Sequence, residues 1–208
     1  DLTAEDLIGD IDPVKALEYG PLSVQAFEPG KIFKANNGVL FFDEINRCSD
    51  KLQNALLQVL QEGVATIGSY DIDFPADFVF IGTMNPDDNS TEELSHVFLD
   101  RFDLIYMSYP DSHDDELRIL ADRARLSVPI PEDILGYIVR FVRGLRHDEK
   151  LERKPSVRAS IGLAERASAN AAINGQDAVS LRDVSAVVGS VLSHRIGLKP
   201  SARYLTSA

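Results

Sequence analysis

The sequence predicts an α/β domain built on a parallel sheet, followed by an all-helical domain. Two stretches, the unbroken apolar run Val39–Phe42 and the largely apolar Phe78–Thr83, lead to polar residues and are separated by a helical pattern. Such runs fit buried parallel strands, covered on both faces and joined by a crossover. After Pro110 the apolar spacing is helical throughout. We therefore expect an α/β core over residues 1–110 and a helical domain over residues 111–208.

Composition limits the class of protein. The chain has 208 residues, of which 44% are hydrophobic, enough for a substantial core. No apolar run approaches the roughly 18 residues that span a bilayer, and the first residues carry no secretory signal. We therefore expect a cytoplasmic protein without a membrane span. A single cysteine, Cys48, and four histidines without zinc spacing predict neither a disulfide nor a zinc site.

Charge argues against a general nucleic-acid binder, because the net charge is −12 and such binders rely on basic surface. The charge is also uneven. Residues 154–208 carry seven Lys and Arg against three Asp and Glu. This excess favours an anionic partner, either a phosphate or the acidic face of a neighbour. A chance excess on solvated helix faces is the alternative.

Residues 1–34 are predicted to form an ordered surface excursion rather than core, because Gly and Pro interrupt them repeatedly. Between these breakers, Asp12–Gly20 is typical of a short helix, with Asp12 as its cap and Pro13 at its first position. A plain surface loop is the alternative.

The first apolar strand ends in two adjacent carboxylates, Asp43 and Glu44. In open α/β sheets, ligands bind at the carboxyl ends of the strands. One carboxylate there can hold a hydrated divalent cation, and its neighbour can orient and deprotonate a water. Two solvated acids at a helix N-terminus, where negative charge is favoured, are the alternative interpretation.

A helix and a hairpin are predicted next. Apolar residues of Ser49–Gly63 recur on one face, with Ser49 or Asp50 as the cap and Gly63 as the end. Val64–Phe74 partly alternates about a Gly68-Ser69 turn, which predicts a hairpin. The hairpin carries no basic residue, which argues against a DNA helicase.

The second strand leads to Asn85, which Pro86 follows. An amide at this position can donate to a γ-phosphate and accept from an attacking water, although Asn-Pro is also a common turn former. Beyond it, Thr91–Leu99 predicts a short helix and Leu104–Tyr109 a third strand.

Four helices are predicted after Pro110: Asp111–Leu126, Glu132–Arg146, Ser156–Asn174 and Leu181–His194. Arg158 lies in the first turn of the third helix, where a cation opposes the helix dipole. Its presence there indicates an anionic partner, with a solvated side chain as the alternative.

These motifs, in this order, resemble the AAA+ ATPases of the MoxR and magnesium-chelatase branch. Gly38–Arg47 looks like the Walker B motif, which implies that Asp43 holds Mg²⁺ and that Glu44 is the catalytic base. Asn85 looks like sensor 1, and Arg158 like sensor 2 of the family's helical lid. The resemblance therefore implies ATP and Mg²⁺ as cofactors.

Arg101, in the stretch LDRFD, looks like the family's arginine finger, which reaches the phosphate held by the neighbouring subunit. Guanidinium suits this role because it stays charged and meets phosphate oxygens in a bidentate fork. Pairing with Asp100 or Asp103 is the alternative.

The resemblance further implies a homo-oligomeric ring, expected to be a hexamer, that remodels a client protein, with a partner carrying a von Willebrand factor A domain. In this branch the excursion within residues 1–34 projects toward the substrate. The alternative task is that of a magnesium-chelatase ATPase subunit, which drives magnesium insertion into a porphyrin.

The sequence departs from the family in lacking the phosphate-binding Walker A loop, G-x-x-x-x-G-K-[ST]. Gly30-Lys31 is followed by Ile32 and is no substitute. We expect the loop to lie before Asp1, and this chain alone to bind ATP weakly and hydrolyse it little. A catalytically silent interaction module is the further alternative.

Overall fold

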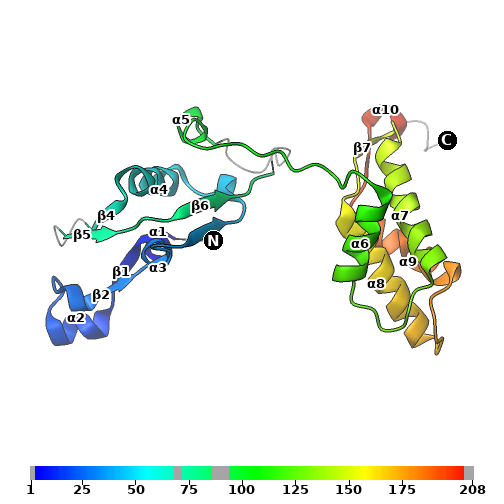
Figure 1. Ribbon diagram of the computed structural model, residues 1–208, viewed down its shortest axis with the longest axis horizontal. Coiled ribbons are helices and arrows are strands. Elements are labelled where there is room, and N and C mark those ends of the chain that lie inside the picture. Colours follow the sequence, from blue (N-terminus) through cyan, green and yellow to red (C-terminus); the bar gives the residue numbers. More distant parts are fainter. Residues whose placement is uncertain (1–2, 68–71, 86–93, 204–208) are drawn as a thin grey trace. The chain divides into compact units, whose positions relative to one another are not determined.

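A computed structural model of the chain describes residues 3–67, 72–85 and 94–203 (Figure 1). The chain divides into two units, residues 1–104 and residues 105–208, each with its own hydrophobic core. No helix within the described ranges is long and apolar enough to cross a membrane.

Unit 1 alternates short helices and strands. In chain order these are α1 (Ala4–Ile8), β1 (Gly9–Ile11), α2 (Pro13–Tyr19), η1 (Val24–Ala26), β2 (Phe27–Pro29), α3 (Lys31–Lys34), β3 (Val39–Phe42), η2 (Ile45–Arg47), α4 (Asp50–Glu62), β4 (Val64–Ile67), β5 (Ile72–Pro75), β6 (Val79–Gly82) and α5 (His96–Leu99). Strands β3 and β6 pair in parallel, whereas β1 with β2 and β4 with β5 pair antiparallel. The predicted α/β class with a parallel sheet is confirmed.

The parallel sheet has one covered and one open face. Val39 lies opposite Val79, and Phe41 lies opposite Ile81. All four side chains are exposed, Phe41 by 61%, whereas Leu40 between them is buried. The prediction that β3 is covered on both faces is therefore wrong. No described element of unit 1 packs on the outer face, so the apolar run reflects a sheet that is covered on one side.

The covered face packs against helices on either side of it in the sequence. The core of unit 1 draws its buried residues from α1, α3, β3, η2, α4 and α5, among them Leu7, Ile32, Leu40, Ile45, Leu56 and Phe98. Helix α4 begins after Ser49 and ends at Gly63, whose φ of 65° closes it in the left-handed region. The predicted helix is confirmed.

The N-terminal excursion was predicted correctly over α2 and wrongly in the segments on either side of α2. Asp12 caps α2, and its Oδ1 accepts from the backbone amides of Val14 and Lys15 at 2.8 Å and 3.1 Å. No residue of α2 is buried. By contrast, Leu7 and Ile32, on either side of α2, are core residues. They are buried because α1 and α3 pack against each other and share one hydrophobic core with Leu40 of β3, despite the Gly and Pro around them.

The hairpin prediction is confirmed by the pairing of β4 with β5, whereas its predicted turn, Gly68-Ser69, lies outside the described residues. The prediction of a strand over Leu104–Tyr109 is wrong. Residues 104–108 form no strand, and the side chain of Met107 is 90% exposed. No described strand lies beside this segment to exchange hydrogen bonds with it, so its apolar residues alone do not make it a strand.

Unit 2 is helical, as predicted. It contains α6 (His113–Arg123), α7 (Glu132–His147), β7 (Leu151–Arg153), α8 (Val157–Ile173), α9 (Leu181–Leu192), β8 (Gly197–Leu198) and α10 (Pro200–Arg203). The four long helices match the four predicted ones. The short antiparallel pair β7 and β8 was not predicted, because two or three residues are too few to show a period.

A buried ion pair joins three helices of unit 2. The carboxylate of Glu116 on α6 is fully buried and accepts from both terminal guanidinium nitrogens of Arg146 on α7 at 2.8 Å. Ser160 on α8 donates to the same carboxylate at 2.6 Å. Burial alone would raise the pKa of Glu116, but these hydrogen bonds and the charges of Arg146 and Arg143 bring it below its ordinary value. Arg146 also lies 4.6 Å from the ring centroid of Tyr109.

Candidate functional site

The carboxyl ends of β3 and β6 bring four polar residues to one edge of the parallel sheet. Phe42 and Gly82 form the last pair of the register, so the residues that follow them are neighbours across the two strands. These residues are Asp43, Glu44, Thr83 and Asn85, which we call the strand-end cluster. Asp43, Glu44 and Asn85 are exposed and Thr83 is half-buried, so the cluster is open to a ligand.

Asp43 has the features of a magnesium-side carboxylate. Its Oδ1 accepts from the hydroxyl of Thr83, and its Oδ2 accepts no hydrogen bond from a described residue. Nowhere in the described ranges do three His, Cys, Asp or Glu side chains gather into a metal site. Mg²⁺ commonly binds through one or two carboxylates and completes its octahedron with waters and phosphate oxygens. A single open carboxylate oxygen therefore fits Mg²⁺ brought in with a nucleotide.

Glu44 follows in an unusual backbone conformation. Its φ of 55° lies in the left-handed region, which residues other than glycine seldom occupy. Its carboxylate pairs with Nε of Arg47 at 3.1 Å, and both side chains are about half exposed. An ion pair with this exposure contributes up to about 1 kcal/mol. A bound ligand can therefore displace Arg47 and leave the carboxylate in contact with water.

Asn85 reaches the same edge by way of β6. The buried side chain of Asn46, two residues beyond Glu44, donates from Nδ2 to the backbone oxygen of Asn85 at 3.4 Å. This contact ties the segment after β6 to the segment after β3. The backbone of Asn85 is thereby held at the same sheet edge as the two acids, and its side chain is exposed there.

Arg101 lies elsewhere in unit 1. Its guanidinium donates to the backbone oxygen of Val97 and, with the amide of Gln61 oriented to satisfy both groups, to the side-chain oxygen of Gln61 at 2.9 Å. Gln61 lies near the end of α4, about 16 Å along the axis from the first residue of that helix at a rise of 1.5 Å per residue. Arg101 therefore contacts the end of α4 that is remote from Asp43 and Glu44. The predicted alternative, pairing with Asp100 or Asp103, is not seen among the described residues.

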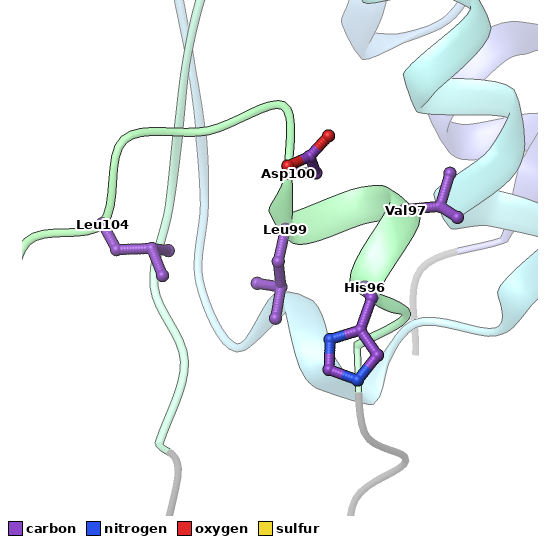
Figure 2. Close-up of a pocket in the computed structure, with 5 residues that line it drawn as sticks. All are labelled: His96, Val97, Leu99, Asp100 and Leu104. Atoms are coloured by element: carbon purple, nitrogen blue, oxygen red, sulfur yellow. The ribbon is translucent and has the colours of Figure 1, made fainter.

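An open hollow lies beside Arg101. It is lined by His96, Val97, Leu99, Asp100 and Leu104 (Figure 2). The side chains of His96 and Leu99 extend to the same side of α5 in this view, whereas Val97 extends away along the helix. The hollow is part of the surface around α5 and contains none of the strand-end cluster.

Arg158 lies in the first turn of α8 in unit 2. It is exposed, and within the described residues it has no hydrogen-bond or ion-pair partner. A cation in this position opposes the helix dipole and is offered to solvent. The side chain is thus accessible to an anionic ligand.

Two members of this site were not predicted from the sequence. Thr83 contacts both acids, and Arg47 pairs with Glu44. The signal for Thr83 was its place at the end of the second predicted strand, since the ends of two paired parallel strands lie side by side. The signal for Arg47 was its spacing of three residues from Glu44, which a helical turn brings together.

Two family matches cover most of the chain. Residues 1–102 match the AAA domain of the dynein-related subfamily, and residues 143–206 match the AAA lid domain. The chain belongs to the AAA+ ATPase family, in its MoxR and magnesium-chelatase branch. The two matches occur in the order that the branch resemblance implied, with the lid after the α/β core.

Curated relatives agree with this AAA+ assignment, and a solved structure shares the fold. The chloroplastic magnesium-chelatase subunit ChlI of Oryza sativa subsp. indica is 32% identical over 95% of this chain and 52% of its own length. The ChlI-1 subunit of Arabidopsis thaliana is 31% identical over 95% of this chain and 51% of its own. A RuvB variant of Thermotoga maritima shares the fold, with a TM-score of 0.53 and 21% identity over 76% of this chain and 46% of that one.

The chain spans about half the length of these curated relatives. AAA+ membership supports ATP hydrolysis as the general activity of the family. The roles of individual residues and the task of the whole protein are proposals.

Proposed function

We propose that this chain belongs to an AAA+ motor in which the strand-end cluster hydrolyses ATP with Mg²⁺. The observation that carries the proposal is the meeting of Asp43, Glu44 and Asn85 at one solvent-open sheet edge. Asp43 would hold the hydrated Mg²⁺ through its open oxygen, Glu44 would take a proton from the attacking water, and Asn85 would position that water against the γ-phosphate. Mg²⁺ supplies charge neutralisation on the phosphates when it is bound.

The proposal assigns the cradle for the β- and γ-phosphates to a segment outside these 208 residues. The sequence contains no Walker A loop, and the curated relatives are about twice as long as the matched region. Activity is therefore best measured on the complete gene product.

The test is phosphate release by the complete gene product with ATP and Mg²⁺. Glu44→Gln removes the base and keeps the shape of the side chain, so we expect the rate to fall at least 100-fold, since a positioned base contributes about 10²–10⁴-fold. Glu149→Gln is the matched control, because Glu149 is exposed and remote in sequence from the cluster. Turnover that survives Glu44→Gln would contradict the proposal. A complete gene product with no turnover would favour the catalytically silent module.

We propose that Arg101 acts on the nucleotide of a neighbouring subunit in a homo-oligomeric ring, expected to be a hexamer. Its guanidinium contacts the end of α4 remote from Asp43 and Glu44, which supports action between subunits rather than within one. The test mixes Arg101→Ala subunits with Glu44→Gln subunits. If Arg101 acts across the interface, the mixture regains activity, because a Glu44→Gln subunit still offers Arg101 to a neighbour with an intact Glu44. If Arg101 acts within its own subunit, the mixture stays inactive.

Arg158 is proposed to sense the γ-phosphate from the lid. The support is its exposed guanidinium at a helix start with no partner among the described residues. Arg158→Ala should weaken the preference for ATP over ADP, measured by competition binding to the complete gene product. Arg182→Ala is a matched control, since Arg182 is also exposed in the first turn of a lid helix. Equal effects of both substitutions would contradict the assignment.

Two tasks are compatible with such a motor. The first is remodelling of a client protein, with a partner that carries a von Willebrand factor A domain. The exposed apolar side chains of helix α2 are the candidate surface for contact with that client. The second is metal insertion into a porphyrin, which the similarity to magnesium-chelatase subunits favours. Adding porphyrin, Mg²⁺, ATP and the proteins encoded beside this gene decides between them, since only the second task yields a fluorescent magnesium porphyrin.

A further inference from the structure

Thr83 makes an unusually dense set of contacts with the segment that carries the two acids. Its backbone amide donates to the oxygen of Phe42 at 2.9 Å, and its backbone oxygen accepts from the amide of Ile45 at 2.9 Å. Its hydroxyl accepts from the amide of Glu44 at 3.1 Å and donates to Oδ1 of Asp43. The two backbone bonds extend the sheet register beyond its last pair. The two hydroxyl bonds are additional, and they involve the two residues proposed for metal binding and proton transfer.

The hydroxyl has a defined direction. A threonine hydroxyl has one proton to donate and two lone pairs to accept with. The amide of Glu44 uses one lone pair, and the proton is directed to Asp43. The β-branched side chain of threonine is also stiff about its first torsion, and its backbone is held on both sides. Thr83 therefore fixes which oxygen of Asp43 stays open and in which direction it faces.

The same hydroxyl also supports the backbone of Glu44. At a φ of 55°, Glu44 occupies a region that costs a residue with a side chain about 1–3 kcal/mol. Such a conformation persists where its surroundings hold it. The hydrogen bond from the amide of Glu44 to the hydroxyl of Thr83 is one such restraint, and it lies at the base of the side chain whose direction matters.

We propose that Thr83 is a positioning residue for ATP hydrolysis, whose hydroxyl sets the open oxygen of Asp43 toward Mg²⁺ and holds Glu44 in the conformation that aims its carboxylate. This inference rests on the proposed function, since it acts through Asp43 and Glu44. A purely structural role is the competing explanation, because the backbone bonds of Thr83 alone would clamp the two strand ends. The two explanations differ in whether the hydroxyl matters.

The test compares Thr83→Val with Thr83→Ser in the complete gene product. Valine keeps the shape and the backbone bonds and removes the hydroxyl, whereas serine keeps the hydroxyl. Loss of a group that orients a metal ligand commonly costs 10–100-fold in activity or metal affinity. We therefore expect Thr83→Val to lower the maximal ATPase rate about 10–100-fold and to raise the Mg²⁺ concentration for half-maximal rate. Thr83→Ser should stay within about threefold of the wild type in both.

Thermal unfolding separates this role from a loss of fold. The expected result is that both variants melt close to the wild type while only Thr83→Val loses activity and Mg²⁺ response. Equal activity of Thr83→Val and the wild type would overturn the inference, as would equal loss in Thr83→Val and Thr83→Ser. A maximal rate that falls only in proportion to a lowered melting temperature, with an unchanged Mg²⁺ requirement, would also overturn it. Glu44→Gln is measured alongside: if that variant stays active, the proposed function itself fails, whatever Thr83 does.

Discussion

Unit 2 closes its hydrophobic core among its own helices, whereas unit 1 leaves one face of its parallel sheet exposed. In unit 2 the helices α7, α8 and α9 bury residues with no accessible surface, such as Ile138, Leu163 and Val191. In unit 1 the inner residue Leu40 is buried, but its neighbour Phe41 is 61% exposed. Parallel sheets are usually buried on both sides. Unit 2 therefore has its structural support built in, while unit 1 presents its site at the edge of a half-covered sheet.

The largest loss of stability is expected from breaking the buried ion pair inside unit 2. Glu116→Ala leaves the guanidinium of Arg146 buried without its bidentate partner, and breaking such a pair costs about 3–5 kcal/mol. Glu149→Ala, on the surface, should change stability by less than about 0.5 kcal/mol. The free energy of unfolding of both variants is measured by chemical unfolding, with hydrogen exchange of the α8 amides as the probe of unit 2. Similar small losses in the two variants would show that the buried pair does not hold the helices together.

A second pair of substitutions tests the two faces of the sheet in unit 1. Leu40→Ala, in the core, should cost about 2–5 kcal/mol. Phe41→Ala, on the outer face, should cost less than about 1 kcal/mol in the 208-residue chain, because the side chain already contacts water. Urea unfolding of both variants gives the comparison. A cost of several kcal/mol for Phe41→Ala would mean that something covers the outer face, contrary to the structure.

Acid should weaken unit 2 through Glu116. Its pKa in the folded protein lies below its ordinary value of 4.5, so the unfolded chain takes up the proton at a higher pH than the folded one. The stabilisation is therefore complete above pH 4.5 and is lost as the pH falls through the folded pKa. Unfolding of unit 2, followed between pH 7 and pH 3, should show this loss. In Glu116→Gln the loss should be smaller, and an identical pH dependence in both proteins would count against the assignment.

The smallest change in stability is expected from a substitution on the exposed helix α2. Leu17 is 90% exposed, so Leu17→Ser should alter thermal stability by less than about 0.5 kcal/mol. Ala26→Ser, at a fully buried position within the same N-terminal excursion, is the contrasting variant and should be clearly destabilising because it buries a hydroxyl. Equal melting of the two variants would contradict the burial that separates them.

The local elements followed from the sequence because their signals are local. Asp12 and Pro13 marked the start of α2, Gly63 marked the end of α4, and the apolar runs marked β3 and β6. The prediction of a strand after Phe102 was wrong, because an apolar run becomes a strand only where another strand can pair with it. The burial of residues near the N-terminus was also missed, since it depends on how α1 and α3 pack.

The sequence predicted which residues belong to the candidate site better than it predicted the contacts that they make. Asp43, Glu44 and Asn85 could be placed at one sheet edge from the strand pattern alone. The hydroxyl of Thr83 and the contact of Arg101 with Gln61 arise only when segments 39–40 residues apart come together in the fold. The strand pattern brings Thr83 to the same sheet edge as the acids, but it does not show which atoms meet. The hydrogen bonds of Thr83 to the two acids and the place of Arg101 therefore required the structure.

If ATP is hydrolysed at the strand-end cluster, the fate of bound ATP must depend on Glu44. Radiolabelled ATP is bound with Mg²⁺ to the complete gene product and to its Glu44→Gln variant, and the bound nucleotide is quenched and separated over time. We expect the wild type to convert bound ATP to ADP, whereas the variant retains ATP over the same period. Formation of ADP by the variant at the wild-type rate would show that ATP is not hydrolysed at this cluster.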